Sequence, residues 1–346
     1  MTLLVAQKVE RGTTREHVPG TSTDSSAGHS GGGGAGAEQS HRREAGPAPL
    51  TTTVPREYVH RASLAEVFLT SCERLDEDRF VLSGQWPRAH TFFTGPDGRH
   101  HDPMQVAETI RQVGLFLAHS EFRVPLGHHF VMWDLSFAVD PDHLGIGPAP
   151  SDLTLTAERS DSVRKGKRLT EFALDITVRR GDATVATGGG RFTCVSAAIY
   201  RRLRGTVPTT PRPAYRPSPL APATFGKALP QDVVLAPGPR AGRWRLNPDP
   251  DHPILFDHGG DHVPGMVLLE AARQAACALL VPGTTLVPTR VSTAFHRYAE
   301  FGTPCWVEAA PMPAQPSGAL GVLVTGHQSG HQVFATQISG PLTPQR

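Results

Sequence analysis

An internal repeat is the feature that most limits what this chain can fold into. Residues 90–112, HTFFTGPDGRHHDPMQVAETIRQ, align without a gap with residues 252–274, HPILFDHGGDHVPGMVLLEAARQ. Polar identities gathered in an E-x-x-R-Q pattern are hard to obtain by chance, so we predict a duplicated domain. The identical pairs are His90/His252, Gly98/Gly260, His100/His262, Met104/Met266, Glu108/Glu270, Arg111/Arg273 and Gln112/Gln274.

Glycine and proline divide the chain around this repeat. The 346 residues include 35 Gly and 32 Pro, many of them in two stretches without apolar periodicity. The first, residues 1–52, is predicted to be a disordered tail, because it holds too little apolar surface to offset the entropy of ordering. The second, residues 206–225, is predicted to be a Pro-rich linker. An N-terminal domain (53–205) and a C-terminal domain (226–346) remain.

Both copies show the same order of elements. Residues 264–283 are apolar almost all round, which predicts a buried helix, and residues 103 onward begin a similar helix in the first copy. Alternating, Val- and Thr-rich segments follow each helix and predict strands, including a hairpin at 175–186. The glycines at 188–190 are interpreted as a bulge or chain crossing. We therefore expect an α+β fold in which an antiparallel sheet wraps around a long central helix, twice.

Composition excludes several classes of protein. The formal net charge of +2 shows no basic excess, so no nucleic-acid partner is expected. No apolar run is long enough to span a membrane. The four cysteines lack any metal-ligand spacing, which predicts reduced thiols in a cytoplasmic protein and no metal site.

The second helix and the loop before it resemble a known family. A helix that opens PGMVLLEAARQ is similar to the central helix of the hotdog fold, although the dehydratases of that fold space their histidine two residues further from the Pro-Gly. The string FDHGGDHVPG with EAARQA resembles more closely the AfsA-type proteins, the A-factor or γ-butyrolactone autoregulator synthases. The resemblance covers residues 55–345 and implies a tandem hotdog fold.

The resemblance also implies an activity. Members of this family transfer a β-ketoacyl group from an acyl-carrier-protein thioester to the hydroxyl of dihydroxyacetone phosphate, and the ester cyclises to a butenolide phosphate. No cofactor is implied. Pairing of the two copies within one chain is expected, and a homodimer stays open. The catalytic residues implied are Glu108 in the first copy and Glu270 with Arg273 in the second.

The chemistry of these residues agrees with such a role. Glu270 and Arg273 are three residues apart and share a helix face. Burial raises the pKa of a carboxylate, which suits a general base, and the guanidinium either keeps Glu270 ionised or binds a phosphate. We expect His258 and His262 to flank Glu270, where they either relay a proton or bind substrate, and we expect further substrate contacts from Asp257 and from Arg111 of the first copy.

Other interpretations remain open at this stage. A Glu–Arg pair at this spacing is often only a structural ion pair. The alternatives within the fold are an acyl-carrier-protein thioesterase or dehydratase, and a non-catalytic regulatory protein that binds acyl chains or lactones. A basic cluster is either a solvated domain end or a docking point for an acidic carrier protein; its members are Arg201, Arg202 and Arg204.

Overall fold

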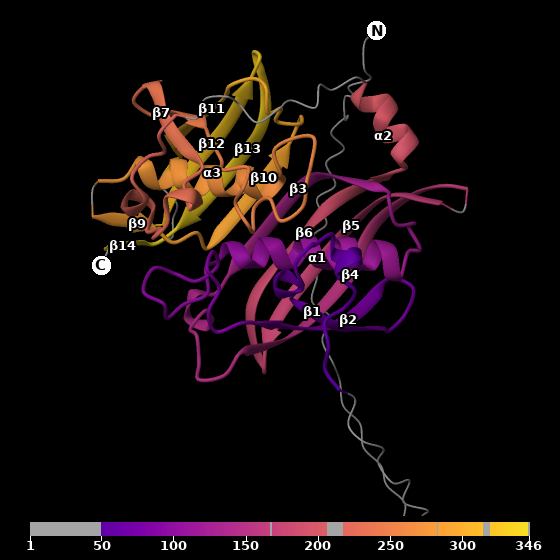
Figure 1. Ribbon diagram of the computed structural model, residues 1–346. Coiled ribbons are helices and arrows are strands. Elements are labelled where there is room, and N and C mark those ends of the chain that lie inside the picture. The colour runs from indigo at the N-terminus through magenta and orange to yellow at the C-terminus, as the bar shows by residue number, and fades with distance from the viewer. Residues whose placement is uncertain (1–49, 167, 206–216, 282, 314–318, 345–346) are drawn as a thin grey trace, which may run out of the picture. The chain divides into compact units, whose positions relative to one another are not determined.

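The structure, a computed structural model, describes residues 50–166, 168–205, 217–281, 283–313 and 319–344 (Figure 1). The predicted tail 1–52 lies outside the described residues up to position 49, and so does the predicted linker from 206 to 216. Residues 50–346 form one compact unit, and the fold is that of this unit alone. The domain boundaries drawn from the sequence stay predictions.

Each copy contains its predicted helix and strands. All elements of the first copy, predicted or not, are η1 (Arg56–Val59), η2 (Leu64–Glu66), β1 (Leu69–Arg74), β2 (Arg79–Trp86), α1 (Met104–Ser120), β3 (His129–Val139), η3 (Pro141–His143), β4 (Ser151–Lys165), β5 (Arg168–Arg180), β6 (Ala183–Val195) and α2 (Ala197–Arg204). In the second copy, they are η4 (Pro222–Phe225), η5 (Pro230–Asp232), β7 (Leu235–Arg240), β8 (Arg243–Leu246), α3 (Gly265–Ala278), β9 (Thr284–Leu286), β10 (Arg290–Phe295), β11 (Cys305–Pro311), β12 (Leu320–Gln328), β13 (His331–Gly340) and β14 (Leu342–Pro344).

The two copies share one antiparallel sheet. Its order is β1-β2-β4-β5-β6-β3-β10-β13-β12-β11-β8-β7, so the second half repeats the first in reverse. The halves join where β3 pairs with β10, with Ser136 opposite Ser292. Helix α1 packs on strands of the first half and α3 on strands of the second, and the two helices also touch (Figure 1). This confirms the predicted α+β architecture and the pairing of the copies within one chain.

Helix α3 is as buried as its sequence predicts, but it is shorter. All residues from 266 to 277 are buried. The helix ends at Ala278, five residues before the predicted end at position 283. Leu280 already closes a turn onto Cys277, and Gly283 adopts a positive φ of 85°, because the chain must reverse to begin β9.

The glycines of β6 serve close packing. The hairpin predicted at 175–186 is confirmed, since Arg180 pairs with Ala183 across a two-residue turn. Both ladders run unbroken through 188–190, so the bulge predicted there is wrong. A Cβ on Gly189 would lie 2.0 Å from the carbonyl oxygen of Leu174, and one on Gly188 would lie 2.7 Å from Ile110 of α1. Only glycine lets the neighbouring strands and α1 approach this closely.

Candidate functional site

The first repeated residue, His90 or His252, holds the loop before each helix. The Nδ1 atom of His90 accepts two backbone N–H groups from the next turn, and its Nε2 lies 3.2 Å from a carboxylate oxygen of Glu66. His252 repeats the pattern, with Nε2 3.0 Å from Asp232. An Nδ1 that accepts leaves the proton on Nε2, which donates to the carboxylate. These two histidines therefore have a structural role.

The repeated glutamine orients the repeated glutamate. Gln112 Nε2 donates to Glu108 Oε1 over 2.7 Å, and its amide also bonds two backbone groups of the segment that leads into β1. Gln274 makes the same three bonds, with Glu270 Oε1 again at 2.7 Å. Each carboxylate is thereby fixed against its own sheet.

The repeated arginine binds the same glutamate through two bonds. Arg111 donates to both oxygens of Glu108, each over 2.8 Å. Arg273 donates to both oxygens of Glu270, with Nε 2.9 Å from Oε2. Glu270 and Arg273, which the sequence placed on one helix face, thus form a bidentate ion pair between buried groups.

A second cation reaches each glutamate and also the opposite copy. Arg61, just after η1, donates from Nε to Glu108 over 3.1 Å and from Nη1 to a loop carbonyl of the second copy over 2.9 Å. Lys227, just after η4, lies 3.9 Å from Glu270 and donates to a loop carbonyl of the first copy over 3.3 Å. Two related sites therefore lie between the copies. We call them the α1 site (Glu108, Arg111, Gln112, Arg61) and the α3 site (Glu270, Arg273, Gln274, Lys227).

The cations reverse the expected titration of the glutamates. Burial alone raises the pKa of Glu108, but Arg111 and Arg61 outweigh it and lower the pKa to about 2. Burial likewise opposes Arg273 and Lys227 at Glu270, whose pKa is also lowered. The predicted rise in the pKa of Glu270 is therefore wrong, and the alternative prediction, that the guanidinium keeps this carboxylate ionised, agrees with the geometry.

The loop that contains His258 was predicted to lie beside Glu270, but it lies beside the α1 site. Burial together with Arg111 and Arg61 lowers the pKa of His258, which places this imidazole beside the first helix. At the α3 site, the aligned positions are Gly95 and Pro96, which carry no titratable group. The prediction that His258 flanks Glu270 is corrected because each loop crosses to the helix of the other copy.

Asp257 fixes this crossing. Its Oδ2 accepts the backbone N–H of Ala62 over 2.7 Å and its Oδ1 that of Ser63 over 3.1 Å. Arg61 lies 3.8 Å away, and the Asp257 side chain is buried. With its oxygens bonded in this way, Asp257 clamps the loop to the first copy, whereas the sequence predicted a substrate-binding role.

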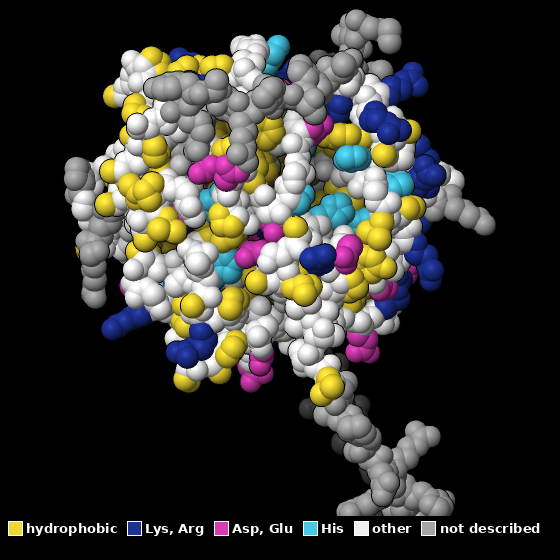
Figure 2. Space-filling model, viewed as in Figure 1, with side chains coloured by type: hydrophobic (Ala, Val, Ile, Leu, Met, Phe, Trp, Pro, Cys, Tyr) yellow, Lys and Arg dark blue, Asp and Glu magenta, His cyan; other side chains and the backbone are white. Residues whose placement is uncertain are grey.

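His262 belongs to a neighbouring cluster that includes α2. Its Nδ1 lies 2.6 Å from Asp261, which also accepts from the Tyr200 hydroxyl over 2.8 Å. The ring of His129 stacks on Tyr200 with centroids 3.7 Å apart. His129 in turn acts electrostatically on His60, which follows η1. Figure 2 shows histidine side chains gathered together on this face of the molecule.

The basic cluster of α2 is divided in two. The Arg204 side chain is only 7% exposed and donates to both Asp261 and Glu300, so it is neither solvated nor a docking residue. Arg201 and Arg202 are exposed at the same helix.

Sequence reasoning missed His60, Arg61 and Lys227. They precede the ungapped repeat, in REYVHRA and PATFGKA, which are 166 residues apart, whereas the repeat itself is offset by 162. A search that allowed a four-residue gap would have aligned Arg61 with Lys227. Nothing in the sequence marks His60 except that Gly226 stands at the matching position.

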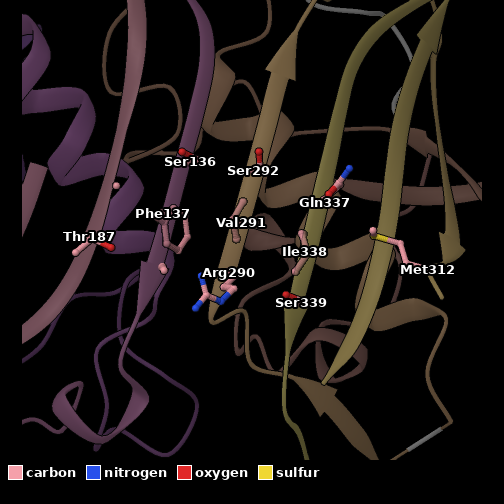
Figure 3. A pocket seen from close by; sticks show the side chains of 12 residues that line it. Ser136, Phe137, Thr187, Arg290, Val291, Ser292, Met312, Gln337, Ile338 and Ser339 are labelled. Carbon is pink, nitrogen blue, oxygen red and sulfur yellow. The ribbon is translucent and has the colours of Figure 1, made fainter. Parts of the chain in front are cut away.

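A separate hollow lies on the outer face of the sheet, where β3 meets β10 (Figure 3). It encloses about 410 Å³ and is lined by Ser136, Ser292, Arg290 and neighbouring side chains. Leu135 and Thr293, which neighbour Ser136 and Ser292 in their strands, are buried and do not line the hollow, so the hollow and the helices lie on opposite faces of the sheet. It contains none of the predicted site residues.

The described residues hold no cluster of three or more His, Cys, Asp or Glu side chains that would bind a metal ion. No helix in this part of the chain is long and apolar enough to cross a membrane.

Buried histidines predict a loss of stability in acid. Burial lowers the pKa of His60 to about 3 and that of His101 to about 4. Unfolding returns both toward the ordinary value near 6.5, so the unfolded chain binds more protons between about pH 4 and 6.5. We expect the free energy of unfolding to fall by at least about 1 kcal/mol between pH 7.5 and 5, measured by urea titration. Equal stability at the two pH values would contradict this.

Two halves of one antiparallel sheet, each around a buried helix, with paired carboxylate sites between them, define a tandem hotdog protein. The model of the AfsA family, the A-factor biosynthesis hotdog domain, matches residues 43–196 and 209–332. The chain belongs to this family.

Named relatives agree with this assignment. The 2-oxo-3-(phosphooxy)propyl 3-oxoalkanoate synthase of Streptomyces virginiae is 50% identical over 291 residues, which are 84% of this chain and 98% of that protein. The synthase of the same name from Streptomyces griseus is 41% identical, over 85% of this chain and 97% of its own. Among solved structures, the 12:0-ACP thioesterase from Umbellularia californica aligns over 76% of this chain and 94% of its own, with 11% identity and a TM-score of 0.46.

Proposed function

We propose that this chain is an acyltransferase that forms a 2-oxo-3-(phosphooxy)propyl 3-oxoalkanoate. The observation that carries the proposal is the 50% identity to a synthase of that name over nearly its whole length. The product is the ester of a 3-oxo acid with dihydroxyacetone phosphate. It forms when the hydroxyl oxygen attacks a thioester carbonyl, the C–S bond breaks and a thiol leaves. The ester then cyclises to a butenolide phosphate.

The α1 site supports this chemistry better than the α3 site does. Arg111 donates from Nε and Nη2 to Glu108 and a backbone carbonyl, and its Nη1 bonds to no described residue. A guanidinium with a free donor at a partly exposed site suits the substrate phosphate. His258 lies beside it, with more than half of its side chain exposed. We assign phosphate binding to Arg111 and His258, and a structural role to Glu270 and Arg273.

The acyl donor is proposed to be a carrier-protein thioester. At the end of the sheet where His129 pairs with Val195, α2 exposes Arg201 and Arg202, and Figure 2 shows Lys and Arg side chains along this edge. Exposed apolar side chains, Ile199 and Leu203, accompany them. A basic surface with apolar contacts next to the cluster of Tyr200 and His262 suits an acidic carrier protein.

Reversing the charge of this surface is expected to weaken the binding of a carrier-bound acyl donor and of no other donor. With Arg201 and Arg202 both changed to Glu, we expect KM for a carrier-protein thioester to rise roughly tenfold and to depend less on salt. KM for a thioester of a short thiol should stay unchanged, since that donor needs no docking surface. An equal effect on both donors, or on neither, would contradict this surface.

Release of thiol distinguishes transfer from hydrolysis. The protein is mixed with a β-ketoacyl thioester, with and without dihydroxyacetone phosphate. The free thiol that is released is measured with a reagent that changes absorbance when it reacts with thiols. We expect release to require dihydroxyacetone phosphate. Release at the same rate without it would identify a thioesterase instead.

A further inference from the structure

His60 adopts a backbone conformation that favours glycine. Its φ is 52° and its ψ is 55°, in the left-handed region. The matching residue of the second copy is Gly226, with φ 63° and ψ 26°. Both follow a short helix whose last carbonyl accepts a bond from the helix arginine, Arg111 or Arg273. A non-glycine residue here costs about 1 kcal/mol, so the first copy keeps an imidazole against its backbone preference.

The hydrogen bonds of His60 leave one ring nitrogen available. His119 Nδ1 lies 2.7 Å from the carbonyl oxygen of Val124 and must therefore carry the proton of that ring. Its Nε2 is then an acceptor, and His60 Nε2, 2.9 Å away, is the donor. The lone pair of His60 Nδ1 is consequently free of any bond from the described residues. Burial and Arg111 lower the pKa of His60 to about 3, which keeps the ring neutral in the free protein, and a substrate phosphate bound to Arg111 would counter this shift and make the ring a stronger base.

The two neighbours of His60 in the chain bond to the α1 site, and its own ring lies against His119 and Phe130. The residue before it, Val59, accepts a bond from Arg111, and the residue after it, Arg61, donates to Glu108. The charges of Arg111 and His258 both contribute to lowering the pKa of His60. Glu108 Oε1 accepts from Arg61, Arg111 and Gln112, and Oε2 accepts from Arg111, so two guanidiniums hold this carboxylate as an ion-paired anion.

We propose that His60 is the general base of the α1 site, an inference that rests on the acyltransferase function proposed above. His60 Nδ1 takes the proton of the dihydroxyacetone phosphate hydroxyl as the oxygen attacks the thioester carbonyl carbon. The C–S bond breaks, and the thiolate takes that proton back from Nδ1. The products are the ester and a neutral thiol, and His60 is neutral again. His119 is a positioning residue that fixes the tautomer.

Replacing His60 by Gly or by Asn tests this role without straining the backbone. Both residues accept positive φ, and Gly is what the second copy has, so we expect the melting temperature to stay or rise. We expect kcat to fall about 10²- to 10⁴-fold. Added imidazole should restore activity to the Gly variant and should leave the rate of the wild type unchanged. The control is Ser329→Asn, at an exposed turn with φ 52°, which should keep full activity.

The outcomes separate two failures. If wild type forms no ester, the proposed function fails. If wild type is active and His60→Gly is equally active, His60 is not the base. A folded His60→Gly variant that is inactive and gains nothing from imidazole would also overturn the base role, because it would show a purely structural imidazole.

Discussion

Changing Glu108 to Gln is expected to lower the free energy of unfolding by about 3–5 kcal/mol, the cost of leaving buried charges unpaired. Glu108 is fully buried and is the shared anion of two guanidiniums, those of Arg61 and Arg111. A neutral amide of the same shape keeps the packing but removes the charge that compensates both. Urea unfolding at pH 7.5 measures the change.

Glu270→Gln is the matched control for this substitution. Its carboxylate contacts one guanidinium, that of Arg273, and Lys227 lies 3.9 Å away. We therefore expect a smaller loss than at Glu108. A larger loss at Glu270, or none at Glu108, would show that the second cation of the α1 site does not depend on its carboxylate.

Changing Arg111 to Lys is expected to lower kcat/KM for dihydroxyacetone phosphate about 10- to 100-fold. Lysine keeps a positive charge near Glu108 but loses the Nη1 donor assigned to the phosphate. Loss of one charged hydrogen bond corresponds to roughly 1.5–3 kcal/mol, hence the range. Steady-state rates at varied dihydroxyacetone phosphate measure it.

Arg273→Lys is the corresponding change at the α3 site. Arg273 is buried and donates to Glu270 and the Phe225 carbonyl, so its loss should lower stability. We expect kcat/KM to change less than threefold when rates are taken well below the melting temperature. If Arg273→Lys abolishes activity and Arg111→Lys does not, the α3 site is the working one.

The architecture was predictable because its signals are local. Strand alternation and the apolar helix of residues 264–278 need no knowledge of distant contacts, and the repeat predicted that the copies would match. The end of α3 was misplaced because Leu279 and Leu280 continue the apolar pattern while the chain turns toward β9.

The composition of the site was predictable only in part. Glu108, Arg111, Glu270 and Arg273 were found, because polar identities in two copies stand out in a buried helix. The further cations, Arg61 and Lys227, were not found, since they lie outside the ungapped repeat and also bond across the interface of the copies, where sequence distance gives no guide. The pKa error has the same origin, because burial was visible in the sequence whereas the second cation was not.

The most direct test of the proposed function is the mass of the product. Purified protein is incubated with a synthetic β-ketoacyl thioester and dihydroxyacetone phosphate, and the phosphorylated products are identified by mass spectrometry. We expect the ester, or the butenolide phosphate that forms from it by loss of water. Free β-keto acid, or an unchanged thioester, would contradict acyl transfer to dihydroxyacetone phosphate.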